Sequence, residues 1–482
     1  MSEQDTIAQS SPQDTPAPQQ GALARMARLA RSAPIVLRRH GPVTLGWSAL
    51  RWLGGQRGYY LRDLLMDTPN FRALPDTPDL PSLLDGAPDS PERRPLALCI
   101  SGVGRDAMRY RCAHLAEQLA KEGYRADVVT TEQANLTEAL TRYQVFVLHR
   151  VMAAPDYLAF VAEAQRRGKV VIFDTDDLVF DVALLDQMPG VETFSRVERQ
   201  YVADTIRRNG QLLRACDAVT VSTAFLRDYL LKTGAHQRVS FLPNVMSAAM
   251  LQAADDALAA AQTQANAAAP GMTTASPQPD AVTIGYFSGT STHNRDFLAA
   301  ADALLWALER YPQTRLRIVG PLTLDQRFDV YDAAGRVIRL PLQPWQRLPS
   351  LYMSVDFAIA PLERGNPFTE AKSCIKYLEA ALCRVPAIAS PRSDFRRVIA
   401  PGRNGLIADT PSEWRAALAQ LIESPDERRA LGAQAYAETR ASETTAARAE
   451  ATCALYRTLA PAAFTRPPVS PAPPTPRAVD QD

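Results

Sequence analysis

Short apolar runs alternate with longer segments whose apolar residues recur at helical spacing throughout the first half of the chain. The short runs are rich in Val, Ile and Leu, so we interpret them as strands and the longer segments as helices. The strands are predicted at residues 96–101, 127–130, 145–149, 170–173, 218–222 and 239–242. Because strands that alternate with helices build right-handed βαβ units, this half is predicted to form a parallel sheet covered by helices.

A second series with the same alternation follows a polar stretch in the middle of the chain. Its strands are predicted at residues 282–287, 316–320, 337–340, 357–360, 387–390 and 405–408. The predicted fold class is therefore α/β, with two doubly wound domains facing a cleft. Ligands of such domains bind outside the carboxyl ends of the strands, so we expect the site in that cleft.

Changes in composition divide the chain into six segments. The predicted segments are a disordered tail at 1–21, a basic amphipathic extension at 22–94, a first domain at 95–246, an Ala-rich linker at 247–280, a second domain at 281–460 and a Pro-rich disordered tail at 461–482. Both tails are polar and of low complexity, which is typical of segments that cannot build a core.

The basic extension has a pattern of its own. Between residues 22 and 62, arginines alternate with Leu, Val, Ile and Trp, and no acidic residue interrupts them. Such a segment can lie on an anionic membrane surface, with Trp47 and Trp52 at the depth of the headgroups. The alternative is a helical extension that packs on its own domain.

The composition of the chain mainly excludes classes of protein and of site. The chain has 53 Lys and Arg against 52 Asp and Glu, so no excess charge points to nucleic acid. Its six cysteines are scattered without a Cys-x-x-Cys pair, which favours buried thiols in a reduced compartment. No signal-peptide pattern and no apolar stretch of membrane-spanning length is visible. We expect a cytoplasmic protein, with the inner face of the cell membrane as a site of peripheral contact.

The segment 366–390 carries the chain's most informative cluster of charges. At about 100° per residue, Lys372, Lys376 and Glu379 share one stripe of a helix for which Thr369 is the expected N-cap. Two cations near a helix N-terminus suit a phosphorylated ligand. The alternative is a solvated face with ordinary ion pairs.

Four candidate catalytic residues follow strands of the first domain. His149 ends one strand, and Asp174, Asp176 and Asp177 follow the next. Carboxylates in this position can act as a base, bind sugar hydroxyls, cap a helix or chelate a divalent metal. A lone histidine there can touch substrate or be merely structural.

Glycines and basic residues follow the first strand of each domain. In the first domain, Gly102 and Gly104 let the backbone approach a ligand, but the third glycine of a dinucleotide fingerprint is missing. The arginines that can meet phosphate or carboxylate groups of an acceptor are Arg105, Arg109 and Arg111. These arginines are equally compatible with an ordinary protein surface.

In the second domain, small residues lead from the first strand into a helix. The candidates for a phosphate cradle there are Gly289, Thr290, His293 and Arg295. The segment lacks the Gly-Lys-Ser/Thr ending of a P-loop, and the alternative is a helix cap with a flexible turn.

Several runs in the second half occur together in one known family. They lie at 284–290, 316–320, 356–362, 378–390 and 402–409, with Trp414 after them. In order and spacing they resemble the GT-B-fold glycosyltransferases, specifically the retaining group called family 4 or group 1. The resemblance covers residues 96–455 and implies two Rossmann-like domains.

The resemblance also implies roles for individual residues. Glu379 matches the glutamate that binds the nucleotide ribose, whereas Ala371 stands where relatives carry the glutamate that approaches the transferred sugar. Lys372, Ser373 and Lys376 are the local substitutes. Arg384 stands where relatives commonly have a glycine with positive φ.

The function implied is transfer of a sugar from a nucleotide sugar to a hydroxyl of a glycan or lipid-linked glycan in cell-surface polysaccharide biosynthesis. Such enzymes usually work without a metal, so the expected cofactor set is empty and the nucleotide sugar is a co-substrate. The first domain is expected to bind the acceptor. Two alternatives remain at this level: a sugar-nucleotide epimerase, and a non-catalytic protein of the same fold that binds glycans or acts as a scaffold.

Overall fold

The computed structural model describes residues 96–267, 281–289 and 294–464, all within one compact unit of the chain. Outside these ranges lie the predicted segments 1–21 and 22–94, parts of the predicted linker and tail, and the candidate residues Thr290 and His293. Among the helices of the described ranges, none is long and apolar enough to cross a membrane.

The first sheet has six parallel strands in the order β2-β1-β3-β4-β5-β6. The strands are β1 (Ala97–Ser101), β2 (Ala126–Thr130), β3 (Val145–His149), β4 (Val170–Thr175), β5 (Ala218–Val221) and β6 (Val239–Phe241). Both faces are buried: Phe146 and Leu148 of β3 join one core cluster, while Val145 and Val147 join another. Strands buried on both faces read as continuous apolar runs, which is why the sequence located them.

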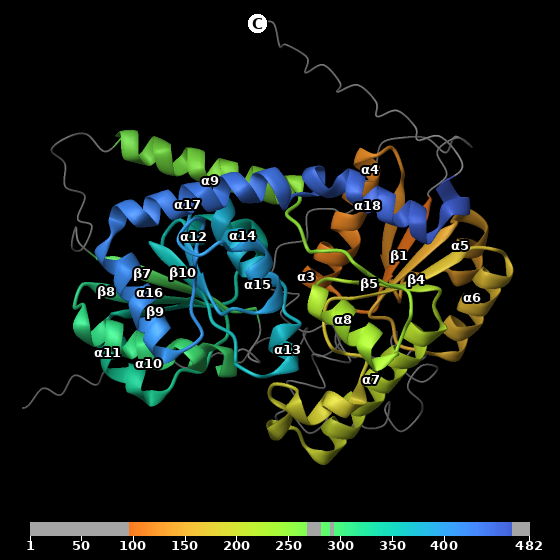
Figure 1. Cartoon of the computed structure of the whole chain (residues 1–482), viewed down its shortest axis with the longest axis horizontal. Coiled ribbons are helices and arrows are strands. Elements are labelled where there is room, and N and C mark those ends of the chain that lie inside the picture. The colour runs from red at the N-terminus through yellow and green to blue at the C-terminus, as the bar shows by residue number, and fades with distance from the viewer. Residues whose placement is uncertain (1–95, 268–280, 290–293, 465–482) are drawn as a thin grey trace, which may run out of the picture. The chain divides into compact units, whose positions relative to one another are not determined.

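The second sheet is also parallel, in the order β12-β11-β10-β7-β8-β9. Its strands are β7 (Val282–Phe287), β8 (Thr314–Val319), β9 (Val337–Leu340), β10 (Phe357–Ala360), β11 (Ala387–Ala389) and β12 (Leu406–Ile407). In each sheet the strand order reverses beside the first strand, at β1/β3 and β7/β10. The prediction of two doubly wound α/β domains is confirmed (Figure 1).

Helices connect the strands of both sheets. In the first half they are α3 (Arg105–Met108), η4 (Arg109–Ala113), α4 (His114–Lys121), α5 (Leu136–Arg142), α6 (Pro155–Arg166), η5 (Val182–Gln187), η6 (Val191–Thr193), α7 (Arg196–Ala215), α8 (Ala224–Thr233) and α9 (Ala248–Ala267). Local sequence explains their ends: Ser195 and Glu198 form a capping box at α7, and Gly234 ends α8 in the left-handed conformation. The helix η4 is a π-helix inserted between α3 and α4.

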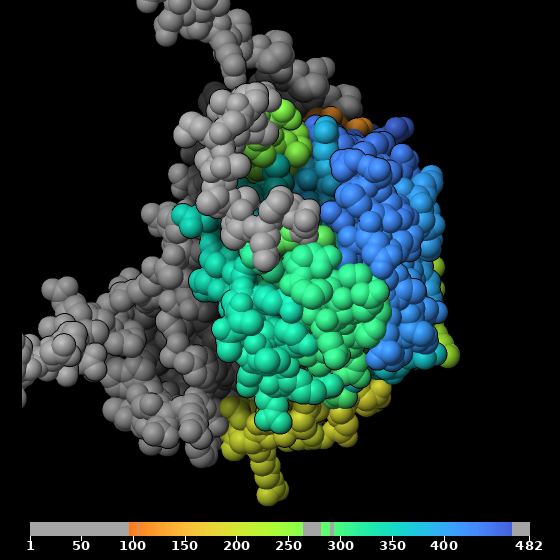
Figure 2. Space-filling view, turned by 90° about the vertical axis from the view of Figure 1, so that its left-hand side faces the viewer, coloured from red at the N-terminus to blue at the C-terminus, as the bar shows by residue number. Residues whose placement is uncertain are grey.

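The second half contains the remaining helices. They are α10 (Asn294–Arg310), η8 (Gln326–Phe328), α11 (Asp329–Ala333), η9 (Trp345–Arg347), α12 (Leu348–Tyr352), α13 (Pro367–Glu370), α14 (Ile375–Leu382), α15 (Ser393–Val398), α16 (Pro411–Glu423), α17 (Pro425–Ser442), α18 (Thr445–Leu459) and η10 (Pro461–Phe464). Phe297 of α10 and Trp414 of α16 share one core cluster. Figure 2 shows this side of the molecule, where the green and cyan residues adjoin the blue C-terminal helices.

The last long helix packs on the first domain, although the sequence assigns its residues to the second. Cys453, Tyr456 and Leu459 of α18 lie in the same core cluster as β1 and α4. Phe464 of η10, within the predicted tail, packs edge-to-face on Tyr124. A helical pattern in the sequence does not say which sheet the helix covers.

All six cysteines lie in the described ranges, and all are buried and free. Several of them belong to the core clusters, including Cys99 and Cys112 in the first domain and Cys374 and Cys383 in the second. The prediction of buried thiols is confirmed.

Arg384 does adopt the left-handed conformation that relatives give to glycine, with φ of 58°. Its guanidinium lies 4.7 Å from the ring centre of Tyr436 on α17. Gly432, also on α17, packs directly against the Arg384 carbonyl, where any side chain would collide with the backbone. Contact with α17 therefore holds Arg384 in an unfavourable backbone conformation.

We expect Gly432→Ala to lower the free energy of unfolding by about 1–3 kcal/mol, because the added methyl group must displace a backbone carbonyl. Urea denaturation measures this change. Ala433→Ser, at the next and exposed position of the same helix, is the control and should stay within about 0.5 kcal/mol. Equal effects of the two substitutions would contradict the tight contact.

Candidate active site

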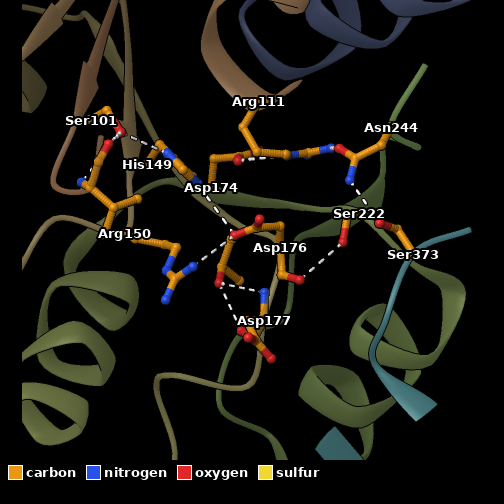
Figure 3. Close-up of polar contacts among 12 residues, drawn as sticks. Ser101, Arg111, His149, Arg150, Asp174, Asp176, Asp177, Ser222, Asn244 and Ser373 are labelled. Carbon is orange, nitrogen blue, oxygen red and sulfur yellow. Dashed lines mark hydrogen bonds and ion pairs between the residues drawn. The ribbon is translucent and has the colours of Figure 1, made fainter. Parts of the chain in front are cut away.

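The carboxyl edge of the first sheet aligns a row of polar side chains. Ser101, His149, Asp174 and Thr220 are paired in register on β1, β3, β4 and β5. In-register residues of neighbouring parallel strands point to the same face, so these side chains lie side by side. All four are buried. Figure 3 shows this part of the site.

Asp174 forms a bidentate ion pair with Arg111 of the π-helix η4. Arg111 Nε and Nη2 donate to the two carboxylate oxygens of Asp174 at 2.9 and 2.7 Å. Thr220 donates to the same carboxylate at 2.6 Å. Arg111 Nη1 also donates to the carbonyl oxygen of Leu242 at 2.6 Å and to Asn244 Oδ1 at 3.0 Å.

These contacts satisfy both charges from within the protein. The side chains of Arg111 and Asp174 are 1% and 0% exposed. Two of the predicted site residues are therefore brought together, but neither presents its charge to solvent. Their geometry is that of a brace, which ties η4 to the sheet and to the segment after β6.

His149 has an oxygen partner at each ring nitrogen. Nδ1 lies 2.8 Å from Ser101 Oγ, which itself donates to the Val103 carbonyl, and Nε2 lies 3.3 Å from Asp176 Oδ1. Burial opposes the charge, but the interactions with Asp176 and Cys112 together outweigh burial and raise the pKa of His149 to about 9. A histidine that is charged at neutral pH and donates from both nitrogens is not arranged to act as a general base.

Asp176 lies between two cations. Its Oδ1 is 3.3 Å from both His149 Nε2 and Arg150 Nη1. Burial raises the pKa of this carboxyl, but Arg150 and His149 outweigh burial and hold the pKa well below its ordinary value. Asp176 is therefore an ionised carboxylate and, unlike Asp174, it retains partial exposure.

Arg150 is a site residue that the sequence analysis missed. It has φ of 48°, in the left-handed region that non-glycine residues seldom adopt. Its Nε is buried without a hydrogen-bond partner. Gly102 packs so closely on the Arg150 carbonyl that a side chain there would collide with it. Its position directly after a strand that ends in His149 is the signal that could have found it.

The other predicted residues of the first domain lie near the same edge. Gly104 precedes α3, whose first residue is Arg105; the Arg105 side chain lies outside the described set. Arg109 points toward the second domain, with its guanidinium 4.9 Å from the ring centre of Trp345. Asp177 also faces that domain, since its Oδ2 accepts from Lys372 Nζ at 2.9 Å.

The expected single helix through the lysine segment is wrong. Asn366 rather than Thr369 caps α13, which ends at Glu370, and α14 begins only at Ile375. Lys372 lies in the connection between the two helices, and only Lys376 and Glu379 share α14. Asp394 accepts a hydrogen bond from the Cys374 backbone N–H at 2.8 Å, which stabilises this break.

The break lets residues 366–373, the docking segment, contact the first domain. Asn366 donates to the Gln187 carbonyl at 3.1 Å, and Asn244 donates to Ser373 Oγ at 3.0 Å. Together with the pair between Lys372 and Asp177, three polar contacts hold this segment. The chain between α13 and α14 must leave the helical conformation to make these three contacts.

Apolar contacts reinforce the docking segment. Phe368 and Ala371 belong to the core cluster of the first domain and are 3% and 0% exposed. Ala371 stands where relatives of the resembling family carry a glutamate. A buried carboxylate without a partner at this position would be costly, so the departure fits the local packing.

Lys376 is enclosed without a hydrogen-bond partner. Its Nζ is buried and lies 4.9 Å from the ring centre of Tyr286 on β7. Burial lowers the pKa of Lys376 to about 8, although Asp296 opposes this shift; Lys372 adds to it. An unpartnered ammonium at the start of α14 is suited to an anion, because the helix N-terminus adds positive charge there.

Glu379 is held by two tyrosines, one from each half of the chain. Tyr110 of η4 donates to Oε1 at 2.9 Å, and Tyr352 of α12 donates to Oε2 at 3.2 Å. Burial raises the pKa of Glu379, whereas Arg109 and the hydroxyl groups oppose the rise. The sequence analysis missed both tyrosines, because partners so distant in sequence leave no local pattern.

The predicted phosphate cradle is only partly described. Gly289 follows β7 and is exposed, while Thr290 and His293 lie outside the described residues. Arg295 is the second residue of α10 and donates to Glu363 Oε1 at 2.5 Å, with its side chain about half exposed. Within the residues that the structure describes, no group of three or more His, Cys, Asp or Glu side chains could hold a metal ion.

The buried pair should be essential for stability. We expect Arg111→Met and Asp174→Ala each to lower the free energy of unfolding by about 3–5 kcal/mol, since each leaves one buried charge without its partner. Arg111→Met/Asp174→Leu should recover part of the loss. Denaturant unfolding measures all three variants. Arg142→Ala breaks an exposed pair with Glu138 and should cost less than about 1 kcal/mol. If Arg111→Met and Asp174→Ala lowered the free energy of unfolding no more than Arg142→Ala does, the assignment of the buried pair as a brace would be contradicted.

His149 should make stability depend on pH. Its pKa in the folded protein is about 9, above the ordinary 6.5, so the folded state binds the proton more tightly than the unfolded state. The resulting stabilisation is complete below about pH 6.5 and is lost as pH rises through about 9. Urea unfolding from pH 6.5 to 9 should show a smaller decline in His149→Gln than in wild type. Parallel declines would overturn this expectation.

Comparison with known proteins relates part of the chain to a family model and the whole fold to solved structures. Residues 295–454 match the family model described as "Glycosyl transferase-like". A search of curated protein sequences found no significant match. Among solved structures, Anabaena HepE in complex with UDP and glucose matches with a TM-score of 0.51 and 14% identity, covering 75% of this chain and 100% of that one.

A second solved structure gives the same result. Sucrose-phosphate synthase from Thermosynechococcus elongatus matches with a TM-score of 0.51 and 18% identity, covering 77% of this chain and 100% of that one. At these identities the likenesses concern the fold, while the family model adds the assignment of the second half. The resemblance read from the sequence is thus confirmed in two respects: residues 295–454 match a glycosyl transferase-like family model, and the chain shares the GT-B fold of these solved structures.

Proposed function

We propose that the chain transfers a sugar from a nucleotide-sugar donor to a hydroxyl group of a glycan or lipid-linked glycan, with retention of the anomeric configuration and without a metal or other cofactor. The observation that supports this most is the enclosed ammonium of Lys376, which has no hydrogen-bond partner at the start of α14. A diphosphate is the ligand that would satisfy it.

The chemistry requires a cation at this place. When the bond between the anomeric carbon and the diphosphate oxygen breaks, negative charge develops on the leaving nucleoside diphosphate. Preorganised cations and helix N–H groups stabilise that charge in the transition state without reorganisation. Lys376 supplies one cation, and Lys372 supplies a second when the diphosphate competes with Asp177 for it.

The acceptor hydroxyl would approach from the edge of the first sheet. Asp176 is the ionised and partly exposed carboxylate there, and it can accept a hydrogen bond from the hydroxyl. His149 and Arg150 hold that carboxylate in place. The hydroxyl oxygen then bonds to the anomeric carbon, and its proton passes to the departing phosphate oxygen on the same face of the sugar.

The choice of donor and setting rests on the comparisons and the sequence pattern. The matched HepE structures contain UDP and glucose or UDP-glucose, so UDP-sugars are the first donors to test. The arginine-rich residues 22–62 would favour work at the cytoplasmic face of a membrane, where lipid-linked acceptors of surface polysaccharides are found.

Release of nucleoside diphosphate tests this function directly. The protein should release UDP from a UDP-sugar only when a glycan or lipid-linked acceptor is present, and a coupled assay measures the release. Interconversion of donors without release would instead establish the epimerase. A folded protein that binds glycans but shows neither reaction across a panel of nucleotide sugars would establish the non-catalytic alternative.

The two lysines should carry unequal shares of donor affinity. We expect Lys376→Ala to weaken UDP-sugar binding about 10- to 100-fold, as for loss of a charge-assisted hydrogen bond. Lys372→Ala should weaken it less, because Lys372 must first leave Asp177. Isothermal titration calorimetry measures both, with Lys232→Ala on the exposed face of α8 as the control. If neither substitution changed the affinity for the UDP-sugar, the two lysines would belong to an ordinary solvated face and not to a donor site.

A further inference from the structure

Two residues of the π-helix η4 extend from the first domain into the second. Arg109 and Tyr110 follow one another, and both contact side chains near the carboxyl edge of the second sheet. π-helical turns are rare and recur at functional sites. The proposed function assigns no role to these two residues.

The Arg109 guanidinium contacts two aromatic rings. It lies 4.9 Å from the ring centre of Trp345, which follows β9, and 4.5 Å from that of Tyr110. Its Nη1 also lies 2.9 Å from Met250 Sδ. A planar cation on an indole face occupies the space that a planar nucleobase would take in an aromatic stack.

The Tyr110 hydroxyl donates to Glu379 Oε1, the carboxylate that the family resemblance assigns to ribose, at 2.9 Å. A ribose hydroxyl binding that oxygen would make the same kind of bond, so it must replace the Tyr110 hydroxyl. Guanidinium and phenol thus make the contacts that a base and a ribose would make.

Little space remains beside Trp345 and Glu379, the residues that Arg109 and Tyr110 contact. The cavity lined by Met250, Trp345, Tyr352 and Glu379 admits only about 10 Å³, the space of a single water molecule. Pockets that hold small-molecule ligands are usually on the order of 300 Å³ or more. A nucleoside therefore requires Arg109 and Tyr110 to leave.

We propose that Trp345 and Glu379 form the nucleoside pocket of the donor site and that Arg109 and Tyr110 fill it as an internal plug, which the nucleotide displaces. This inference rests on the proposed function, because it assumes a nucleotide donor. The plug reduces donor affinity in proportion to the fraction of molecules in which it has left the pocket, because only those molecules can bind the nucleoside.

The neighbouring residue limits how the plug moves. Arg111 is fixed by its bonds to Asp174, Leu242 and Asn244, so displacement is confined to the residues before it. Those residues are α3 and the loop with Gly102 and Gly104. Release of the plug thus moves the loop beside Arg150, which links occupation of the donor pocket to the acceptor edge.

Calorimetric titration with UDP and, separately, with inorganic pyrophosphate tests the plug. Tyr110→Phe removes the bond to Glu379 and should lower the Kd for UDP roughly tenfold, while Arg109→Ala frees Trp345 and should lower it at least as much. Neither change should alter the affinity for pyrophosphate, which needs only the lysine site. Tyr143→Phe is the matched control: it removes a phenol bond of 2.8 Å to Asp127 away from this site.

Each outcome decides between the two proposals. Tighter UDP binding in both variants with constant pyrophosphate binding supports the plug. Unchanged UDP affinity overturns the plug and leaves the proposed function standing. Weaker UDP binding also overturns it, and makes Arg109 and Tyr110 direct nucleotide ligands. If no protein, wild type included, binds UDP or pyrophosphate, the proposed function fails and the plug fails with it.

Discussion

The buried ion pair between Arg111 and Asp174 is the interaction on which the rest of the site depends. Desolvating two charges is costly, and the pair compensates only because the geometry is bidentate and Thr220, Leu242 and Asn244 satisfy the remaining groups. The same contacts fix the π-helix against the sheet. Asn244 accepts a hydrogen bond from Arg111 and donates one to Ser373, so the same hydrogen-bond network reaches the docking segment.

Around this brace, each half of the chain completes the other's site. The docking segment brings Lys372 to Asp177, and η4 brings Tyr110 to Glu379. Charges that would meet substrate are therefore paired across the halves in the unliganded protein. Such pairing gives buried carboxylates and ammonium groups a partner in the unliganded protein. A ligand must break these contacts and replace them with its own. Lys376 on α14 is the exception, because its ammonium has no hydrogen-bond partner.

The sequence predicted the sheets well because strands buried on both faces leave continuous apolar runs. It also placed His149 and the aspartates at the correct edge, since position after a strand defines that edge. It could not tell Asp174 from Asp176: both follow β4 two positions apart, but only Asp174 meets Arg111. It expected one helix beginning at Thr369, whereas Asn366 caps a short helix and Asp394 stabilises the break before the next one, because a hydrogen bond to a side chain distant in sequence overrides helical periodicity.

The return of α18 to the first domain has a consequence for how the protein is made. Cys453, Tyr456 and Leu459 complete the core beneath β1 and α4, although more than 300 residues separate them from β1 along the chain. Domains usually fold as units while the ribosome is still extending the chain. Here the first domain lacks one wall of its core until the residues of α18 have been added. The apolar surface that α18 covers therefore has no partner while the second domain is being synthesised.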